Sequence, residues 1–192
     1  MEIIIIIFTS YLIGSIPFGF ILTKFFLKKD IREVGSGNIG ATNALRTGNK
    51  IIGYSTLIFD ILKAIVPVLF IKFYNNEYVF LSSLSVFIGH VFPVWLKFKG
   101  GKGVATYIGI LFCLNYILGI IFTISWIVVY LISKYSSLSS LISSLSIPVY
   151  LFIFTNESYY YFYIIMFILI FYTHRENIKR LKNNTESKTK IY

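Results

Sequence analysis

Long stretches with few charges are the feature of this 192-residue chain that most restricts its fold. Residues 11–27, 51–73 and 117–132 are mainly apolar, and about 20 such residues cross the hydrocarbon core of a bilayer. Hydrophobic residues make up 56% of the chain and charged residues only 14%, which is too apolar for a single soluble core of this length. We therefore expect an all-α, polytopic membrane protein.

Apolar runs and the breaks between them predict seven spans. These cover residues 3–27, 51–72, 78–96, 104–115, 117–133, 138–155 and 158–173. The run 104–115 is short for a core about 30 Å thick, so it could be only partly inserted. The first run is too long for a signal peptide and has an acidic residue, Glu2, at its start, so we expect it to remain as a span.

The distribution of basic residues predicts the orientation. Residues 28–50, 97–102 and 175–190 carry five, three and six Lys or Arg, which is 14 of the 18 in the chain. Basic segments beside spans mark the cytoplasmic side, so we expect the N-terminus outside and the C-terminus in the cytoplasm, and no binding to nucleic acid. Two basic segments share a side only if an even number of spans separates them, which favours seven helices. Five is the alternative, if residues 104–133 and 138–173 each form one long helix.

Two features of the apolar segments concern packing. In the first span, Pro17 predicts a kink. Small residues lie around it at spacings that let a neighbouring helix approach closely: Ser10, Gly14, Ser15 and Gly19. In the second span, Asp60 and Lys63 lie three residues apart on one helical face, and we expect an internal ion pair rather than a substrate or proton path. We place one domain at 1–182 and a polar, disordered tail at 183–192.

The segment after the first span is rich in glycine and polar side chains. Its sequence at 35–46 is GSGNIGATNALR, in which backbone amides near Gly35, Gly37 and Gly40 could converge on an anion. Arg46 offers a charged fork suited to phosphate, and neutral donors could complete the site: Ser36, Asn38, Thr42 and Asn43. An ordinary polar loop is the alternative interpretation.

A second segment, GHVFPVWLKFKGGKGVAT at 89–106, places glycines and Lys102 just before a predicted helix. Helix N-termini attract anions, so Gly101, Lys102 and Gly103 form a second candidate anion site. The spacing is not that of a nucleotide-binding P-loop. We expect His90, at the end of a span, to be a hydrogen-bonded structural residue.

The third segment, HRENIKRL at 174–181, follows the last span. His174 and Asn177 would share a face if the last helix continues, although the segment could equally be a solvated stop. The chain has no GxSxG elbow, no metal-ligand cluster and no His-x4-Asp arrangement, so we expect neither metal nor cofactor. These observations suit a reaction between phosphorylated substrates, one of them lipidic, and equally suit an organic-phosphate transporter.

These three strings, together with SYLIGSIPFGF at 10–20, resemble the motifs of the bacterial acyl-phosphate:glycerol-3-phosphate acyltransferases, the PlsY family. The resemblance runs from the first helix to Leu181. It implies acyl transfer from an acyl phosphate to the 1-hydroxyl of sn-glycerol 3-phosphate, giving 1-acylglycerol 3-phosphate and phosphate, in the bacterial cytoplasmic membrane. It also implies a functional link to the peripheral enzyme that makes the acyl phosphate.

The residue roles expected from this resemblance are as follows. Arg46 and Lys102 bind phosphate, and Ser36 and His174 are the catalytic residues. The general base is either His174 or an oxygen of a substrate phosphate. The remaining substrate-binding candidates are Asn177, Asn38, Asn43, Gly37, Gly40, Gly101 and Gly103. A transporter would instead need polar groups deep in several spans, and a scaffold would need no glycine-rich anion motifs.

Overall fold

The computed structural model describes residues 1–155 and 159–189, and within them every regular element is a helix. The predicted break at Asn156–Glu157 and the end of the predicted tail, with Lys190, lie outside the described residues. The chain divides into two compact units, Met1–Leu114 and Asn115–Tyr192, each of which is described by itself.

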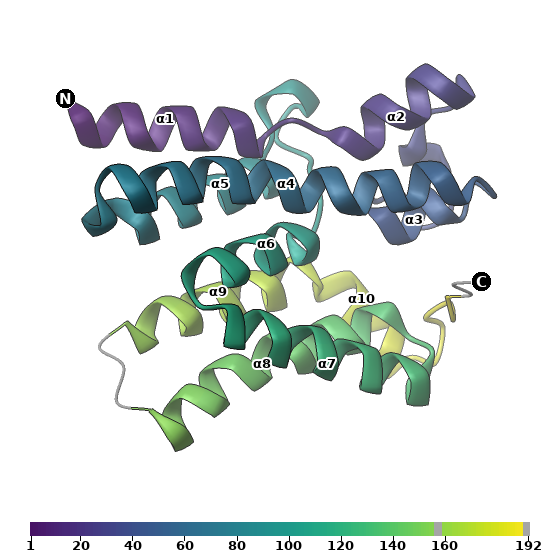
Figure 1. Cartoon of the computed structure of the whole chain (residues 1–192). Coiled ribbons are helices and arrows are strands. Elements are labelled where there is room, and N and C mark those ends of the chain that lie inside the picture. The colour runs from purple at the N-terminus through teal and green to yellow at the C-terminus, as the bar shows by residue number, and fades with distance from the viewer. Residues whose placement is uncertain (156–158, 190–192) are drawn as a thin grey trace. The chain divides into compact units, whose positions relative to one another are not determined.

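The first unit contains six α-helices and three short 3-10 turns within its described residues (Figure 1). The helices are α1 (Glu2–Gly14), α2 (Phe18–Leu27), α3 (Ala41–Leu45), α4 (Lys50–Tyr74), α5 (Val79–Val91) and α6 (Val104–Leu114). The turns are η1 (Ile31–Glu33), η2 (Asn76–Tyr78) and η3 (Val94–Leu96).

The first predicted span is broken rather than only kinked. Helix α1 ends at Gly14 and α2 begins at Phe18, because Pro17 has no N–H to continue the helical ladder. Helix α4 is 25 residues long and packs against both halves, as Figure 1 shows. The break exposes the carbonyl of Ile16, which accepts a hydrogen bond of 2.8 Å from Lys63 Nζ on α4.

Glycines allow α1 and α5 to pack with their backbones close together. A Cβ on Gly14 would lie 2.2 Å from the Val86 carbonyl oxygen, and one on Gly89 would lie 2.3 Å from the Tyr11 carbonyl oxygen. Buried hydroxyls of Ser10 and Ser82 meet at 2.9 Å across the same interface. The predicted close approach of a neighbouring helix is therefore present.

The second unit contains α7 (Tyr116–Ser133), α8 (Ser136–Phe154), α9 (Tyr160–Thr173) and α10 (Arg175–Lys182). Asn115 caps α7 by accepting the Ile117 amide and has extended backbone, so residues 104–133 are not one continuous helix. Helices α7 and α8 pack side by side, and Trp126 Nε1 donates to Ser140 Oγ at 3.1 Å.

Four helical segments of the described chain are long and apolar enough to cross a membrane: Glu2–Leu27, Asn76–Leu96, Tyr116–Ser133 and Ser136–Phe154. Shorter apolar helices are Val104–Leu114 and Tyr160–Thr173, and α4 carries the charges of Asp60 and Lys63. The all-helical membrane architecture is confirmed. The count of seven spans and the orientation stay predictions.

Candidate functional site

The glycine-rich segment between α2 and α4 is organised by one buried amide, that of Asn43. Its Oδ1 accepts the backbone N–H of Ser36 at 2.9 Å. Its Nδ2 donates to three backbone carbonyls, those of Ile31 at 3.0 Å, Val34 at 2.8 Å and Asn38 at 2.8 Å. Because these bonds span residues 31–43, Asn43 draws the segment into one compact loop, and its amide is already engaged within that loop.

Two glycines in this loop adopt backbone conformations that other residues rarely take. Gly35 has φ +54° and Gly37 has φ +71°. A Cβ on Gly35 would lie 2.7 Å from Cδ of Arg46, so the arginine side chain passes directly over this glycine. Ser36, between the two glycines, is exposed, whereas Arg46 is partly buried. The loop therefore places an arginine beside exposed backbone, as phosphate binding requires.

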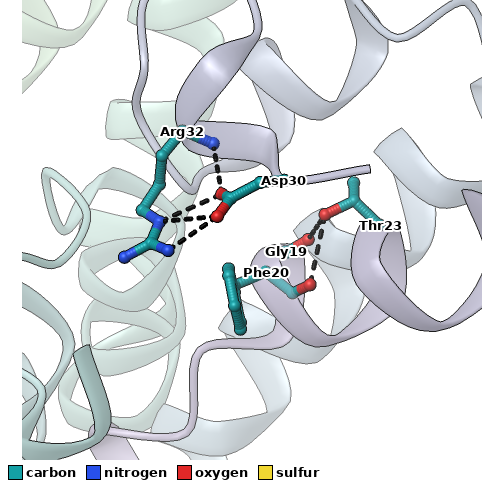
Figure 2. A network of polar contacts seen from close by, with 5 residues as sticks. All are labelled: Gly19, Phe20, Thr23, Asp30 and Arg32. Atoms are coloured by element: carbon teal, nitrogen blue, oxygen red, sulfur yellow. Dashed lines mark hydrogen bonds and ion pairs between the residues drawn. The ribbon is translucent and has the colours of Figure 1, made fainter. Parts of the chain in front are cut away.

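An ion pair lies at the start of this loop. Figure 2 shows Asp30 and Arg32, whose side chains pair with an Nη2–Oδ2 distance of 2.6 Å, while Asp30 also accepts the Arg32 amide at 2.9 Å. The hydrogen bond from the Arg32 side chain lowers the pKa of the Asp30 carboxyl to about 2, so this carboxylate stays charged. The Arg32 guanidinium lies over the Phe20 ring at 5.0 Å. We did not predict this pair from the sequence, although an Asp side chain commonly caps a helical turn by accepting the backbone N–H two residues farther along.

The Gly100–Gly101 backbone is held against the end of α5. The amides of Gly100 and Gly101 donate to the carbonyls of Val91 and His90, at 3.0 and 3.1 Å. A Cβ on Gly101 would lie 2.1 Å from His90 Nε2, and a Cβ on Gly103 would lie 2.1 Å from the Phe87 ring. The glycines are thus required by close packing, and the partly buried Lys102 side chain projects from between two buried backbone positions.

His174 lies at the junction of α9 and α10, so the last helix does not continue straight through it. Its Nδ1 lies 2.8 Å from the Ile170 carbonyl oxygen. A carbonyl oxygen can only accept, so Nδ1 carries a proton, and in the neutral imidazole Nε2 holds the ring's basic lone pair. The imidazole is buried, which fixes this orientation.

Asn177 is also buried, and its Nδ2 donates to Glu186 Oε1 at 2.6 Å. The same carboxylate accepts from Ser137 Oγ at 2.8 Å and from Arg180 Nε at 2.7 Å. Burial raises the pKa of the Glu186 carboxyl, but hydrogen bonds from Arg180, Asn177 and Ser137 outweigh burial and lower it below its usual value. Glu186 falls in the segment for which we predicted disorder, so this pairing was missed.

The structure brings the candidates together in three groups. Ser36, Gly37, Asn38, Gly40, Asn43 and Arg46 share the first loop, Gly101, Lys102 and Gly103 share the second segment, and His174 and Asn177 share the last helical junction. Gly40 caps α3, a role that the sequence did not suggest. Among the described residues, no three His, Cys, Asp or Glu side chains are grouped to hold a metal ion. The catalytic and binding roles themselves stay predictions.

Comparison with known proteins identifies the family. The family model described as glycerol-3-phosphate acyltransferase matches residues 4–184. A glycerol-3-phosphate acyltransferase of Pelagibacter ubique (strain HTCC1062) is 69% identical over 192 residues, which is 100% of each chain. Another, from Bartonella henselae, is 50% identical and the match covers 96% of this chain and 90% of the relative.

Two solved structures share the fold. Both are of PlsY (YgiH), an integral membrane glycerol 3-phosphate acyltransferase, at 33% identity. The glycerol 3-phosphate form aligns with a TM-score of 0.93 over 99% of this chain and 96% of that one. The lysophosphatidic acid form aligns with a TM-score of 0.89 over 98% and 95%. By sequence, fold and motif content, the chain belongs to the PlsY family of glycerol-3-phosphate acyltransferases.

Proposed function

We propose that this protein transfers the acyl group of an acyl phosphate to the 1-hydroxyl of sn-glycerol 3-phosphate, releasing 1-acylglycerol 3-phosphate and phosphate. The observation that carries the proposal is that the solved relatives are a glycerol 3-phosphate form and a lysophosphatidic acid form. These two ligands are the acceptor and the product of the proposed reaction. This would be the first acylation in bacterial phospholipid synthesis.

The proposed donor fits the residues present. An acyl phosphate is a mixed anhydride with a good leaving group, so the protein needs no nucleophile of its own. Its tasks are to hold two phosphate groups close together, orient the acceptor hydroxyl and stabilise the oxyanion that forms on the acyl carbon. A separate peripheral enzyme would supply the acyl phosphate.

We assign phosphate binding to Arg46 and Lys102. Arg46 passes over Gly35, beside the exposed Ser36, and Lys102 projects from the tightly packed glycines of the second segment. The Ser36 side chain would complete the oxyanion and phosphate contacts, together with first-loop amides other than those of Ser36 and Gly37, which bond within the loop. Asn38, Gly37, Gly40, Gly101 and Gly103 would shape these sites. Asn43 acts on them by holding the loop, because its amide is spent on four internal hydrogen bonds.

His174 is the side chain best suited to take the proton of the acceptor hydroxyl. With Nδ1 donating to Ile170, the basic lone pair is on Nε2. An oxygen of a substrate phosphate is the alternative base. Asn177 would orient the acceptor or the phosphate from one helical turn farther along α10.

We place the site at the cytoplasmic face of the bacterial membrane, in a seven-helix chain with its N-terminus outside. The basic residues gather in the same three segments that carry the candidate site. Within the second unit, the tail contacts the turn between α7 and α8, since the Thr189 amide donates to the Lys134 carbonyl. This supports two spans between them, as seven helices require and five do not.

The test is to supply purified protein in detergent or vesicles with palmitoyl phosphate and glycerol 3-phosphate, and to measure lysophosphatidic acid and phosphate. We expect both products in equal amounts, and none when palmitoyl-CoA replaces palmitoyl phosphate. Product from palmitoyl-CoA alone would contradict the proposed donor. Acylation at the 2-hydroxyl, read from the product's regiochemistry, would contradict the proposed acceptor position.

A further inference from the structure

The interior of the first unit holds a charged cluster that the proposed mechanism does not use. Asp60 and Lys63 lie on α4 and form the ion pair expected from the sequence, with Lys63 Nζ 2.7 Å from Asp60 Oδ1. Their side chains are only 3% and 2% exposed. His90, on α5, places its Nδ1 3.8 Å from the same Asp60 oxygen. Two opposite charges and an imidazole are thus gathered away from solvent.

One end of this cluster meets the break in the first span. Lys63 Nζ donates to the Ile16 carbonyl at 2.8 Å and lies 5.9 Å from the centroid of the Phe18 ring. Pro17 breaks the helix here, and the Ile16 carbonyl accepts the Phe18 amide at 3.1 Å, so Lys63 supplies a second donor from another helix at this break.

The other end meets the second glycine segment. The His90 ring fills the space beside Gly101, where an added Cβ would lie 2.1 Å from Nε2. The His90 carbonyl accepts the Gly101 amide at 3.1 Å, one residue before Lys102. His90 makes no hydrogen bond through Nδ1 to the described residues, so packing against Asp60 and Gly101 holds its ring in place.

Packing alone does not require such a cluster. Apolar side chains of similar volume in place of a buried ion pair are often neutral or stabilising, because burying charges is costly. In this protein, the polar atoms connect three separate elements: the α1–α2 break, α4 and the glycine segment that follows α5.

We propose that Asp60, Lys63 and His90 form a positioning network that holds Gly101, and through it Lys102, in the orientation that binds substrate phosphate. The inference rests on the proposed function for its consequence, since Lys102 is the group being positioned. None of the three residues contacts the reacting atoms in this role. Loss of the network displaces the glycine segment, and weaker phosphate binding follows.

Kinetics of two variants test the network. Asp60→Asn/Lys63→Met removes both charges without leaving one uncompensated, and His90→Ala removes the ring beside Gly101. We expect KM for at least one phosphate-bearing substrate to rise about tenfold or more, because small displacements of a binding group are costly. The matched control is Lys72→Met on the same helix, whose Nζ donates to the Cys113 carbonyl at 2.6 Å, and its KM values should match the unsubstituted protein.

A spectroscopic readout separates displacement of the segment from general loss of structure. The chain has two tryptophans, Trp95 near the glycine segment and Trp126 in the second unit. In a Trp126→Phe background, both network variants should change the iodide quenching of Trp95. In a Trp95→Phe background, the quenching of Trp126 should stay the same. Unchanged KM values in folded variants would overturn the inference, and so would raised KM values with unchanged Trp95 quenching.

If the Asp60→Asn/Lys63→Met variant does not fold, a double-mutant cycle between His90→Ala and Gly101→Ala, measured by activity in whole membranes, replaces it. A side chain at 101 collides with the His90 ring, so the double variant should lose less activity than the product of the two single losses. Independent losses would overturn the inference. Absence of lysophosphatidic acid from the unsubstituted protein would instead contradict the proposed function, while the Trp95 measurement would still report on the network.

Discussion

A single amide, that of Asn43, pairs with four backbone groups of the glycine-rich loop. Asn43→Ala should remove the partner of the Ser36 N–H and of the Asn38 carbonyl, at about 1–3 kcal/mol for each such group that water cannot reach, while the Ile31 and Val34 carbonyls keep the amides of Val34 and Gly37. Asn43→Asp should be at least as harmful, because it turns a second oxygen toward the carbonyls. The unfolding temperature and the rate of acyl transfer should both fall. Asn183→Ala, at an exposed position, is the control, and equal effects at both positions would argue against this role for Asn43.

His174 carries a separate prediction at the same scale. If Nε2 is the general base, His174→Ala should lower kcat by about 100-fold or more while the protein remains folded. The measurement is turnover at saturating concentrations of both substrates, with thermal unfolding as the check on structure. Turnover close to that of the unsubstituted protein would remove His174 as the base and favour a substrate phosphate oxygen.

Glu186 predicts how stability depends on pH. The pKa of the Glu186 carboxyl in the folded protein is lowered below the ordinary value of 4.5. Its contribution to the free energy of unfolding is therefore complete above pH 4.5 and is lost as pH falls through the folded-state pKa. Glu186→Gln should therefore lower the unfolding temperature most at neutral pH, and the difference from the unsubstituted protein should shrink on acidification below 4.5. A difference that stays constant, or grows, at acidic pH would contradict this account. The measurement is thermal unfolding across that range.

At the scale of whole helices, the close approach of α1 and α5 depends on glycine. Gly14→Ala would drive a methyl group into the Val86 backbone, and we expect a cost of about 1–3 kcal/mol in the free energy of unfolding. Gly53→Ala is the matched comparison, because its nearest neighbours are atoms of the Leu45 side chain, which can change rotamer. Unfolding in detergent should be clearly easier for Gly14→Ala than for Gly53→Ala. Equal stability would show that the interface can relax.

The elements that the sequence predicted well are those that depend on local pattern. Charge-poor runs predict helices because a lipid-facing backbone must pair its own polar groups. The ion pair of Asp60 and Lys63 follows from helical spacing alone. The hydrogen bonds of Asn43 and the pairing of Asn177 with Glu186 join residues several positions apart through a folded loop, so sequence spacing could not predict them. His90 beside Gly101 depends likewise on how two segments pack.

At the scale of the whole molecule the question is the membrane topology, and contacts within the second unit help to answer it. Tyr130 Oη donates to the Thr189 carbonyl at 2.6 Å, and Ser137 Oγ donates to Glu186, so both ends of the α7–α8 turn contact the tail. Helices α8 and α9 therefore leave from and return to one end of this unit. A single helix over 138–173 would separate the turn from the tail by a membrane thickness.

Labelling with a membrane-impermeant thiol reagent tests this topology, because the chain has one cysteine, Cys113, and it is buried. In a Cys113→Ala background, seven helices with the N-terminus outside predict that Asn76→Cys reacts in intact spheroplasts. Lys29→Cys, Lys134→Cys and Asn183→Cys should react only after permeabilisation. Position 134 is decisive, because five helices would place it outside while leaving the other three positions where they are. Labelling of Lys134→Cys in intact spheroplasts would therefore exclude seven spans and require the tail contacts to be rearranged in the membrane.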